Sequence, residues 1–192
     1  APTVTAAVTG VADDVGVITG IVASGSVTDD TRPVASGTLT AALSGSETVR
    51  VYDGSSYLGD ATVSGTTWSY ADSRTLTNNQ SVSYTARVAD VAGNQSVAGT
   101  SYTFTVDTFA PTTTAAVTAI TDDTGLLTGT VASGGLTDDF HPDVSGTLST
   151  ALSAGQVVRV YDGSTYLGEA AISGTTWTFA DTRNLVNNQV VS

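Results

Sequence analysis

Residues 49–72 read VRVYDGSSYLGDATVSGTTWSYAD, and residues 158–181 return almost the same text, VRVYDGSTYLGEAAISGTTWTFAD. Apolar and polar residues alternate in short runs within this stretch, and clusters rich in Gly, Ser and Asp separate the runs. Alternation with period two is typical of a β-strand that buries one face, and Asp-Gly between two such runs is typical of a hairpin turn. The stretch therefore predicts short antiparallel strands.

The repetition extends along most of the chain. The text that runs from Ala1 to Gln80 returns from Ala110 to Gln189 without a gap, which gives a period of about 109 residues with roughly two-thirds of the positions identical. A fixed period of this length is the signature of a tandem array of whole domains. An array provides length and copy number, so a mechanical or adhesive role is favoured over catalysis.

The period predicts one domain at residues 1–109 and a second at residues 110–192. Nothing after Ser192 matches the stretch from Tyr84 to Phe109. We therefore expect the second domain to be incomplete, without its last two strands, and the sequence to be an excerpt from a longer polymer of such units.

The same alternation predicts seven strands in the first unit, and no segment shows a sustained apolar stripe of helical period. Seven strands in about 109 residues indicate an all-β fold of tandem immunoglobulin-like β-sandwich domains, although a jelly roll or a partly open barrel would show similar patterning. Trp68 and Trp177 are expected in the core, and Tyr84 at a tyrosine corner. The predicted strands are Thr3–Thr9, Val34–Thr40, Thr48–Asp53, Tyr57–Val63, Thr67–Ala71, Ser81–Ala89 and Thr100–Val106.

The composition narrows the range of partners. The chain has 18 acidic and 6 basic residues, a formal net charge of −12, and neither Cys nor Met. The electrostatic field of this negative net charge attracts cations and repels phosphate backbones and anionic lipid heads. Nucleic acid and membrane surfaces are therefore not expected as partners. The absence of Cys excludes disulfides and thiolate metal sites. No apolar run approaches the roughly 20 residues of a membrane helix, so no membrane insertion is expected.

Aspartates gather in the predicted turns, often as adjacent pairs. Adjacent carboxylates repel unless hydrogen bonds, solvent or a cation offset the repulsion. Calcium takes six to eight oxygen ligands and suits turns rich in Asp, Thr, Ser and Gly, whereas magnesium demands a stricter octahedron. A solvated acidic turn remains the alternative, because Asp is itself a favoured turn residue. The predicted calcium ligands are Asp13, Asp14, Asp29, Asp30, Asp90, Asp107, Asp122, Asp123, Asp138 and Asp139.

The internal comparison favours calcium. The Asp pairs return at equivalent positions of both copies, while a neighbour such as Arg32 is replaced by His141. Asp107 precedes a linker too short to behave as a free coil, so carboxylates of both units could meet at the junction and a bridging ion would fix the angle between the units. Alternating strand directions place Asp90 at the opposite, amino-terminal end, where it would face a preceding unit.

Several of these motifs together resemble a known family. They are TVDTFAPT at residues 105–112, TDDTG at 121–125, TDD at 137–139 and SGT at 145–147, with VYDG at 51–54, GTTW at 65–68 and DVAGN at 90–94. This ordered set resembles the bacterial immunoglobulin-like repeats of giant type I secreted, RTX-type adhesins and biofilm-associated surface proteins. Phe109 departs from the family, which usually has a small polar residue at that position.

The resemblance implies a calcium-rigidified extender at the bacterial cell surface that holds a distal binding domain away from the cell, in adhesion and biofilm formation. Its partners would be the adjacent repeats of the same chain, with host or surface glycans and proteins bound through other domains. By carry-over, the aspartates named above would be the ion ligands.

Catalysis is not expected. The only histidine is His141, whose equivalent in the other copy is Arg32, and a catalytic triad or a zinc site would need more partners.

Two non-catalytic alternatives remain open. The unit could bind a glycan or a protein through Tyr52, Tyr57, Tyr161 and Tyr166, or open sheet edges of the second unit could accept strands from another chain.

Overall fold

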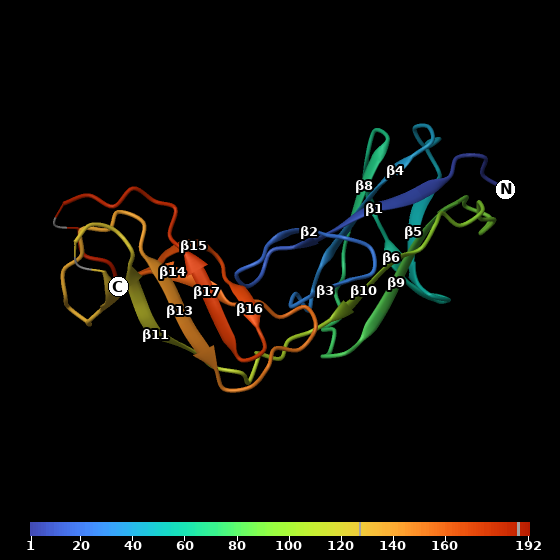
Figure 1. Cartoon of the computed structure of the whole chain (residues 1–192). Coiled ribbons are helices and arrows are strands. Elements are labelled where there is room, and N and C mark those ends of the chain that lie inside the picture. The colour runs from blue at the N-terminus through green and yellow to red at the C-terminus, as the bar shows by residue number, and fades with distance from the viewer. Residues whose placement is uncertain (127, 188) are drawn as a thin grey trace. The chain divides into compact units, whose positions relative to one another are not determined.

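The structure is a computed structural model, and it describes residues 1–126, 128–187 and 189–192. The chain divides into two compact units, Ala1–Phe109 and Ala110–Ser192, called unit 1 and unit 2 below. Every regular element among the described residues is a β-strand (Figure 1). The predicted all-β class is therefore confirmed, and no described segment forms an apolar helix of membrane-spanning length.

Unit 1 is built from two five-stranded sheets. The first sheet has the strand order β2 (Gly20–Val22), β1 (Ala6–Asp13), β4 (Val34–Leu39), β8 (Thr67–Ala71) and β7 (Thr62–Ser64). The second has the order β3 (Ser26–Thr28), β10 (Tyr102–Val106), β9 (Ser81–Ala89), β5 (Thr48–Asp53) and β6 (Ser56–Asp60). All pairs are antiparallel except β3 with β10, which is parallel.

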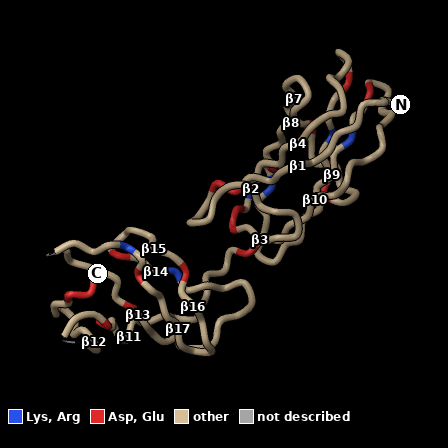
Figure 2. Tube along the Cα trace, turned by 45° about the horizontal axis from the view of Figure 1, so that its top comes forward, with Lys and Arg blue, Asp and Glu red and all other residues tan. Residues whose placement is uncertain are grey.

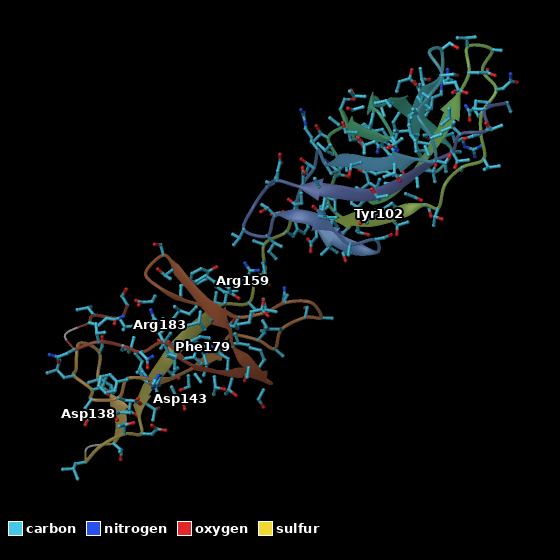
Figure 3. All side chains as sticks on the ribbon, turned by 90° about the horizontal axis from the view of Figure 1, so that it is seen from above. Tyr102, Asp138, Asp143, Arg159, Phe179 and Arg183 are labelled. Atoms are coloured by element: carbon cyan, nitrogen blue, oxygen red, sulfur yellow. The ribbon has the colours of Figure 1, made fainter. Side chains whose placement is uncertain are left out.

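One hydrophobic core lies between the two sheets of unit 1. Its buried side chains come from both sheets, and β1 of the first sheet packs against β9 and β10 of the second. Tyr102, labelled in Figure 3, ties the two sheets together at one edge by donating a hydrogen bond of 2.6 Å to the carbonyl of Val22. This arrangement confirms the predicted β-sandwich.

The two tryptophans lie in the core, as predicted, each 3% exposed. Trp68 lies across the strand pair from Gly37, and a Cβ on Gly37 would collide with the indole ring and with the carbonyl oxygen of Ala7. Gly146 has the same relation to Trp177 in unit 2. Glycine is therefore required at these positions by close packing and not by a turn.

The predicted strands agree with the structure in part. The bounds of β5, β8 and β9 are as predicted, but the first strand runs from Ala6 to Asp13 and not from Thr3 to Thr9. The predicted strand Tyr57–Val63 is two strands, because the chain leaves the second sheet after β6 and enters the first sheet as β7. The short strands β2 and β3 were not predicted, since three residues show no measurable alternation.

Unit 2 repeats the first sheet in the order β12 (Gly129–Val131), β11 (Ala115–Asp122), β13 (Asp143–Leu148), β17 (Thr176–Ala180) and β16 (Ala171–Ser173). The second sheet is represented by two strands, β14 (Arg159–Asp162) and β15 (Thr165–Glu169). Its core among the described residues is correspondingly small. The buried hydrophobic residues are Leu148, Val158, Val160 and Trp177.

Candidate functional site

The two Asp pairs of unit 1 converge on Thr28, at the end of the sandwich where β1, β3 and β10 all end. The hydroxyl of Thr28 donates a 2.6 Å hydrogen bond to Asp13 Oδ2, and the backbone N–H of Asp30 donates one of 3.1 Å back to the same hydroxyl. The carbonyl of Thr28 accepts a hydrogen bond of 2.8 Å from the backbone N–H of Asp107. We call the residues Asp13, Asp14, Asp29, Asp30 and Asp107 the acidic pole.

Local turn chemistry positions the two inner carboxylates of the acidic pole. Asp13 Oδ1 accepts the N–H of Val15 at 3.0 Å, and Asp30 Oδ1 accepts the N–H of Arg32 at 2.7 Å. These are turns in which Asp satisfies the backbone two residues further along the chain. Asp13 and Asp30 are buried, with 8% and 3% of their surface exposed. The sequence placed Asp13 outside the strands, but it is the last residue of β1.

The outer carboxylates Asp14 and Asp29 are exposed. Asp29 lies against the loop after β1, since a Cβ on Gly16, whose φ is 70°, would collide with its carboxylate. Burial raises the pKa of Asp30, and the negative charges of Asp14 and Asp13 add to the rise, while the N–H of Arg32 lowers it. The acidic pole therefore concentrates negative charge that a proton or a cation would relieve.

Unit 2 carries the same arrangement. The hydroxyl of Thr137 donates to Asp122 Oδ2 at 2.6 Å and accepts the N–H of Asp139 at 3.0 Å, and the N–H of Asp123 approaches Asp139 Oδ2 at 3.4 Å. Asp138 lies against Gly125 as Asp29 does against Gly16. In Figure 2 acidic residues, drawn in red, lie beside β2 and β3 of unit 1. The threonines were missed by sequence reasoning, although TDD recurs at both positions.

Asp90 lies at the other end of unit 1, because β9 and β10 are antiparallel and Asp90 follows the last residue of β9. Its Oδ1 accepts the N–H groups of Ala92 and Asn94 at 3.0 and 2.9 Å, and its Oδ2 accepts the Asn94 side-chain amide at 2.9 Å. These bonds, the Asn94 amide first, hold the pKa of Asp90 below its ordinary value. The structure thus separates Asp90 from the acidic pole.

A preformed metal cage is absent from the part of the chain that the structure describes, since no three acidic or histidine side chains there are gathered in a way that could hold an ion. Calcium binding by the ten predicted aspartates stays a prediction. An ion at the acidic pole would need rotation of Asp14 or Asp29, together with backbone carbonyls and water, which calcium accepts as ligands.

A second polar cluster, which sequence reasoning missed, joins the two sheets of unit 1. Arg74 pairs with Asp72, just after β8, at 2.7 Å and with Asp53, the last residue of β5, at 2.9 Å. The hydroxyl of Tyr84 on β9 donates to Asp72 Oδ2 at 2.5 Å. We call Asp53, Asp72, Arg74 and Tyr84 the inter-sheet clasp, because its members come from both sheets.

Electrostatics in the clasp are governed by the burial of Asp72, which is 3% exposed. Burial opposes its charge, but the hydrogen bonds from Arg74 and Tyr84 outweigh this and hold the pKa of Asp72 below its ordinary value. The pKa of Tyr84 is raised by burial and by the Asp72 carboxylate. Tyr84 therefore stays a neutral donor.

The clasp corrects the predicted tyrosine corner. In such a corner the hydroxyl bonds to the backbone a few residues upstream. Here Tyr84 donates to a side-chain carboxylate twelve residues upstream. A buried carboxylate that carries a charge is a stronger acceptor than a carbonyl, so Asp72 captures the hydroxyl.

Unit 2 repeats the ionic part of the clasp. Arg183 pairs with Asp181 at 2.7 Å and with Asp162 at 2.8 Å. The recurrence of Asp-x-Arg at residues 72–74 and 181–183 was visible in the sequence, and the internal comparison that singled out the Asp pairs would have found it.

The tyrosines of the ligand-binding alternative form cross-strand pairs. The rings of Tyr52 and Tyr57 are 5.5 Å apart and inclined by 56°, with the Arg50 guanidinium 5.5 Å from the centre of the Tyr57 ring. Tyr161 and Tyr166 repeat this pair in unit 2. Tyr57 and Tyr166 remain about half exposed. His141 is exposed, and among the described residues its hydrogen bond to Asp139 is made by the backbone N–H.

Comparison with known proteins shows neither a family nor a function for this chain. No protein-family model matches the chain, and no curated protein matches it. Among solved structures, the fibronectin(III)-like modules of CbhA from Clostridium thermocellum align with a TM-score of 0.47 and 15% identity, over 85% of this chain and 76% of that one. That likeness is too distant to carry an argument, so the sandwich assignment stands on the strand order and the core.

Proposed function

We propose that the chain is a structural extender segment of a bacterial cell-surface adhesin, which calcium stiffens at the acidic poles. The fold fits such a role, since a β-sandwich module repeated in tandem provides length. The protein would act outside the cell, holding a distal binding domain away from the surface in adhesion and biofilm formation.

The observation that carries the proposal is the threonine-centred acidic pole, which recurs with the same hydrogen bonds around Thr28 and Thr137. The inner carboxylates are fixed by these bonds, while Asp14 and Asp29 are exposed beside them. Asp13 and Asp30 are thus held in place, whereas Asp14 and Asp29 can reorient. Calcium accepts oxygen ligands in flexible geometry, so it could bind between the two pairs.

The site in unit 1 adjoins the linker. Asp107 bonds to Thr28 through its backbone N–H, and its Oδ1 accepts the N–H of Phe109 at 3.1 Å. An ion that recruits the Asp107 carboxylate would restrain the residues that follow it. That restraint is the proposed source of stiffness.

The direct test is thermal unfolding of the whole chain in excess calcium, in excess magnesium and with a chelator. Binding at about a hundred times the dissociation constant adds roughly 2.7 kcal/mol per independent site, so calcium should raise the Tm by several degrees and magnesium should not. An unchanged Tm in saturating calcium would remove the ion from the proposal.

Paired variants locate the effect. The double variant Asp14→Asn with Asp29→Asn should abolish most of the rise in Tm that calcium causes in unit 1, since it removes the two exposed ligands. The matched control is Glu47→Gln with Asp60→Asn, which removes two charges outside the acidic pole, one half-buried and one exposed, and should leave the shift intact. Equal losses in both variants would mean that calcium acts only by screening the net charge. Small-angle scattering should show a longer maximum dimension with calcium than with chelator.

A further inference from the structure

Two arginines face each other on the second sheet of unit 1. Arg50 on β5 lies directly opposite Arg87 on β9, and residues so placed have their Cβ atoms about 5 Å apart on one face of the sheet. The alternating neighbours Val49, Val51 and Val88 are buried in the core, so both arginines belong to the outer face. Like charges in this position repel each other and destabilise the sheet.

Positive charge is scarce in this chain, which makes the pair unusual. Only six residues are basic, against 18 acidic ones. Arg74 and Arg183 are ion-paired in the clasps, and Arg32 bonds to the Thr75 hydroxyl. Two further arginines placed against each other bring repulsion to the fold, so their arrangement points to a task other than stability.

Arg50 lacks a close acidic partner. Its Nε is buried without a hydrogen bond to any described residue. Asp60, opposite Arg50 on β6, lies 3.7 Å from this Nε and accepts the hydroxyl of Tyr57 at 2.8 Å. The Nε–H donor of Arg50 is therefore unsatisfied, and a buried donor without an acceptor costs free energy.

Arg87 is half-buried and makes no side-chain hydrogen bond or ion pair with another described residue. The acidic residues next to β5 and β9 have other partners: Glu47 accepts a backbone N–H at 3.0 Å, Asp53 belongs to the clasp, and Asp90 is held by its own turn. Residues 91–106, which follow β9, contain no acidic side chain. Both guanidinium groups therefore keep donors for an acceptor from outside the chain.

Aromatic surface lies beside the arginine pair. Tyr52 and Tyr57 form the neighbouring cross-strand pair, and the Gln95 amide donates to the Tyr52 hydroxyl at 2.6 Å. Tyr57 is 52% exposed. The association of arginine with tyrosine recurs in unit 2, where Arg159, labelled in Figure 3, lies 5.5 Å from the centre of the Tyr166 ring.

We propose that this face of unit 1 binds an acidic sugar, whose carboxylate pairs with Arg50 and Arg87 and whose ring lies against Tyr57. Guanidinium groups bind carboxylates through paired, charge-assisted hydrogen bonds. The C–H groups on the face of a sugar ring carry slight positive charge, which suits the negative face of an aromatic ring. The net charge of −12 opposes ligands that carry many negative charges, so a single carboxylate is favoured over a polyphosphate. The site does not involve calcium.

The test is an NMR titration of the isotope-labelled whole chain with methyl β-glucuronide, in chelator. The Nε–H signals of Arg50 and Arg87 should shift together, with one dissociation constant on the order of 1 mM. Those of Arg32 and Arg74 should stay in place. Methyl β-glucoside, which lacks the carboxylate, should not bind, and acetate, which lacks the ring, should bind about tenfold more weakly. The absence of a saturable shift would overturn the proposal, as would acetate binding as tight as that of the glucuronide, since the site would then accept any carboxylate.

Variants separate binding from a structural role. Arg87→Gln should weaken glucuronide binding at least about tenfold, because a charge-assisted hydrogen bond is lost. Its urea midpoint should stay the same or rise, because the repulsion with Arg50 is removed. Arg32→Gln is the matched control and should change neither quantity, whereas Tyr57→Leu should lower the affinity for the glucuronide to that for acetate. A lower urea midpoint with unchanged binding in Arg87→Gln would show that Arg87 serves the fold, and would contradict the proposal.

Discussion

Unit 1 and unit 2 share most of their sequence, yet they bury different numbers of hydrophobic residues. Seventeen buried hydrophobic residues form the core cluster of unit 1, and four form that of unit 2 among the described residues. The four are the equivalents of Leu39, Val49, Val51 and Trp68. They come from β4, β5 and β8, three strands whose counterparts β13, β14 and β17 are present in unit 2.

The local polar structure, by contrast, is the same in both units. The Thr–Asp bond of the acidic pole is 2.6 Å long in each, and the Arg–Asp pairs of the clasp agree within 0.1 Å. Turns and short-range ion pairs therefore depend on nearby sequence, whereas burial depends on strands that are distant in the chain. The predictions below test this division.

The largest expected difference is in the stability of the two units. With Trp177→Phe only Trp68 reports on unfolding, and with Trp68→Phe only Trp177 does, so the fluorescence of each variant follows one unit through a urea titration. Unit 2 should unfold first, with a free energy of unfolding lower by more than about 3 kcal/mol, the contribution of two fully buried side chains. Equal urea midpoints for the two variants would show that the units unfold together, and would contradict the expected difference between them.

Removing the cation of the clasp should have the next largest effect. Arg74→Met keeps most of the side-chain length but leaves the buried carboxylate of Asp72 without its ion pair, which should cost about 3 kcal/mol in unit 1. Arg183→Met should lower the free energy of unfolding of unit 2 by a smaller amount, because the core of unit 2 is smaller. Urea titrations of the two variants provide the measurement.

Arg32→Met is the matched control for these variants. Arg32 is exposed, and its guanidinium bonds to no described residue other than Thr75, whose hydroxyl lies at 3.0 Å. Its loss should change the free energy of unfolding by less than about 0.5 kcal/mol. A loss as large as that of Arg74→Met would mean that net charge, and not the clasp, accounts for the result.

The sequence predicted what depends on local pattern. Alternation located β5, β8 and β9 to the residue, and the core positions of both tryptophans followed from their place in a strand. The gathering of Asp13, Asp30 and Asp107 around Thr28 could not be predicted, because it depends on the parallel pairing of β3 with β10, and β3 is only three residues long. The clasp was missed because an isolated Asp-x-Arg resembles an ordinary polar turn.

Close packing of glycine on tryptophan gives a third test. Gly37→Ala places a methyl group into the indole of Trp68 and the carbonyl of Ala7, and should destabilise unit 1 by about 1–3 kcal/mol. Gly146→Ala should be milder if the smaller core of unit 2 yields more easily. Gly45→Ala, where nothing lies near the added Cβ, is the control and should leave the urea midpoint almost unchanged. Equal costs in both units would mean that their strand pairs are equally rigid.

The smallest effect, a loss of about 1–2 kcal/mol in the free energy of unfolding, is expected for Tyr84→Phe, which removes one hydrogen bond to Asp72 and little packing.

The same variant should change how stability depends on pH. The pKa of Asp72 is below its ordinary value in the folded state, so its contribution to stability is complete above the unfolded pKa and is lost as pH falls through the folded pKa. Without the tyrosine hydroxyl the folded pKa rises towards the unfolded one. The acid limb of unfolding, followed by Trp68 fluorescence between about pH 5 and pH 1, should then begin at a higher pH. The same limb followed by Trp177 should not move, because Asp181 has no tyrosine among its described partners. A shift in both limbs would show that the two clasps are coupled.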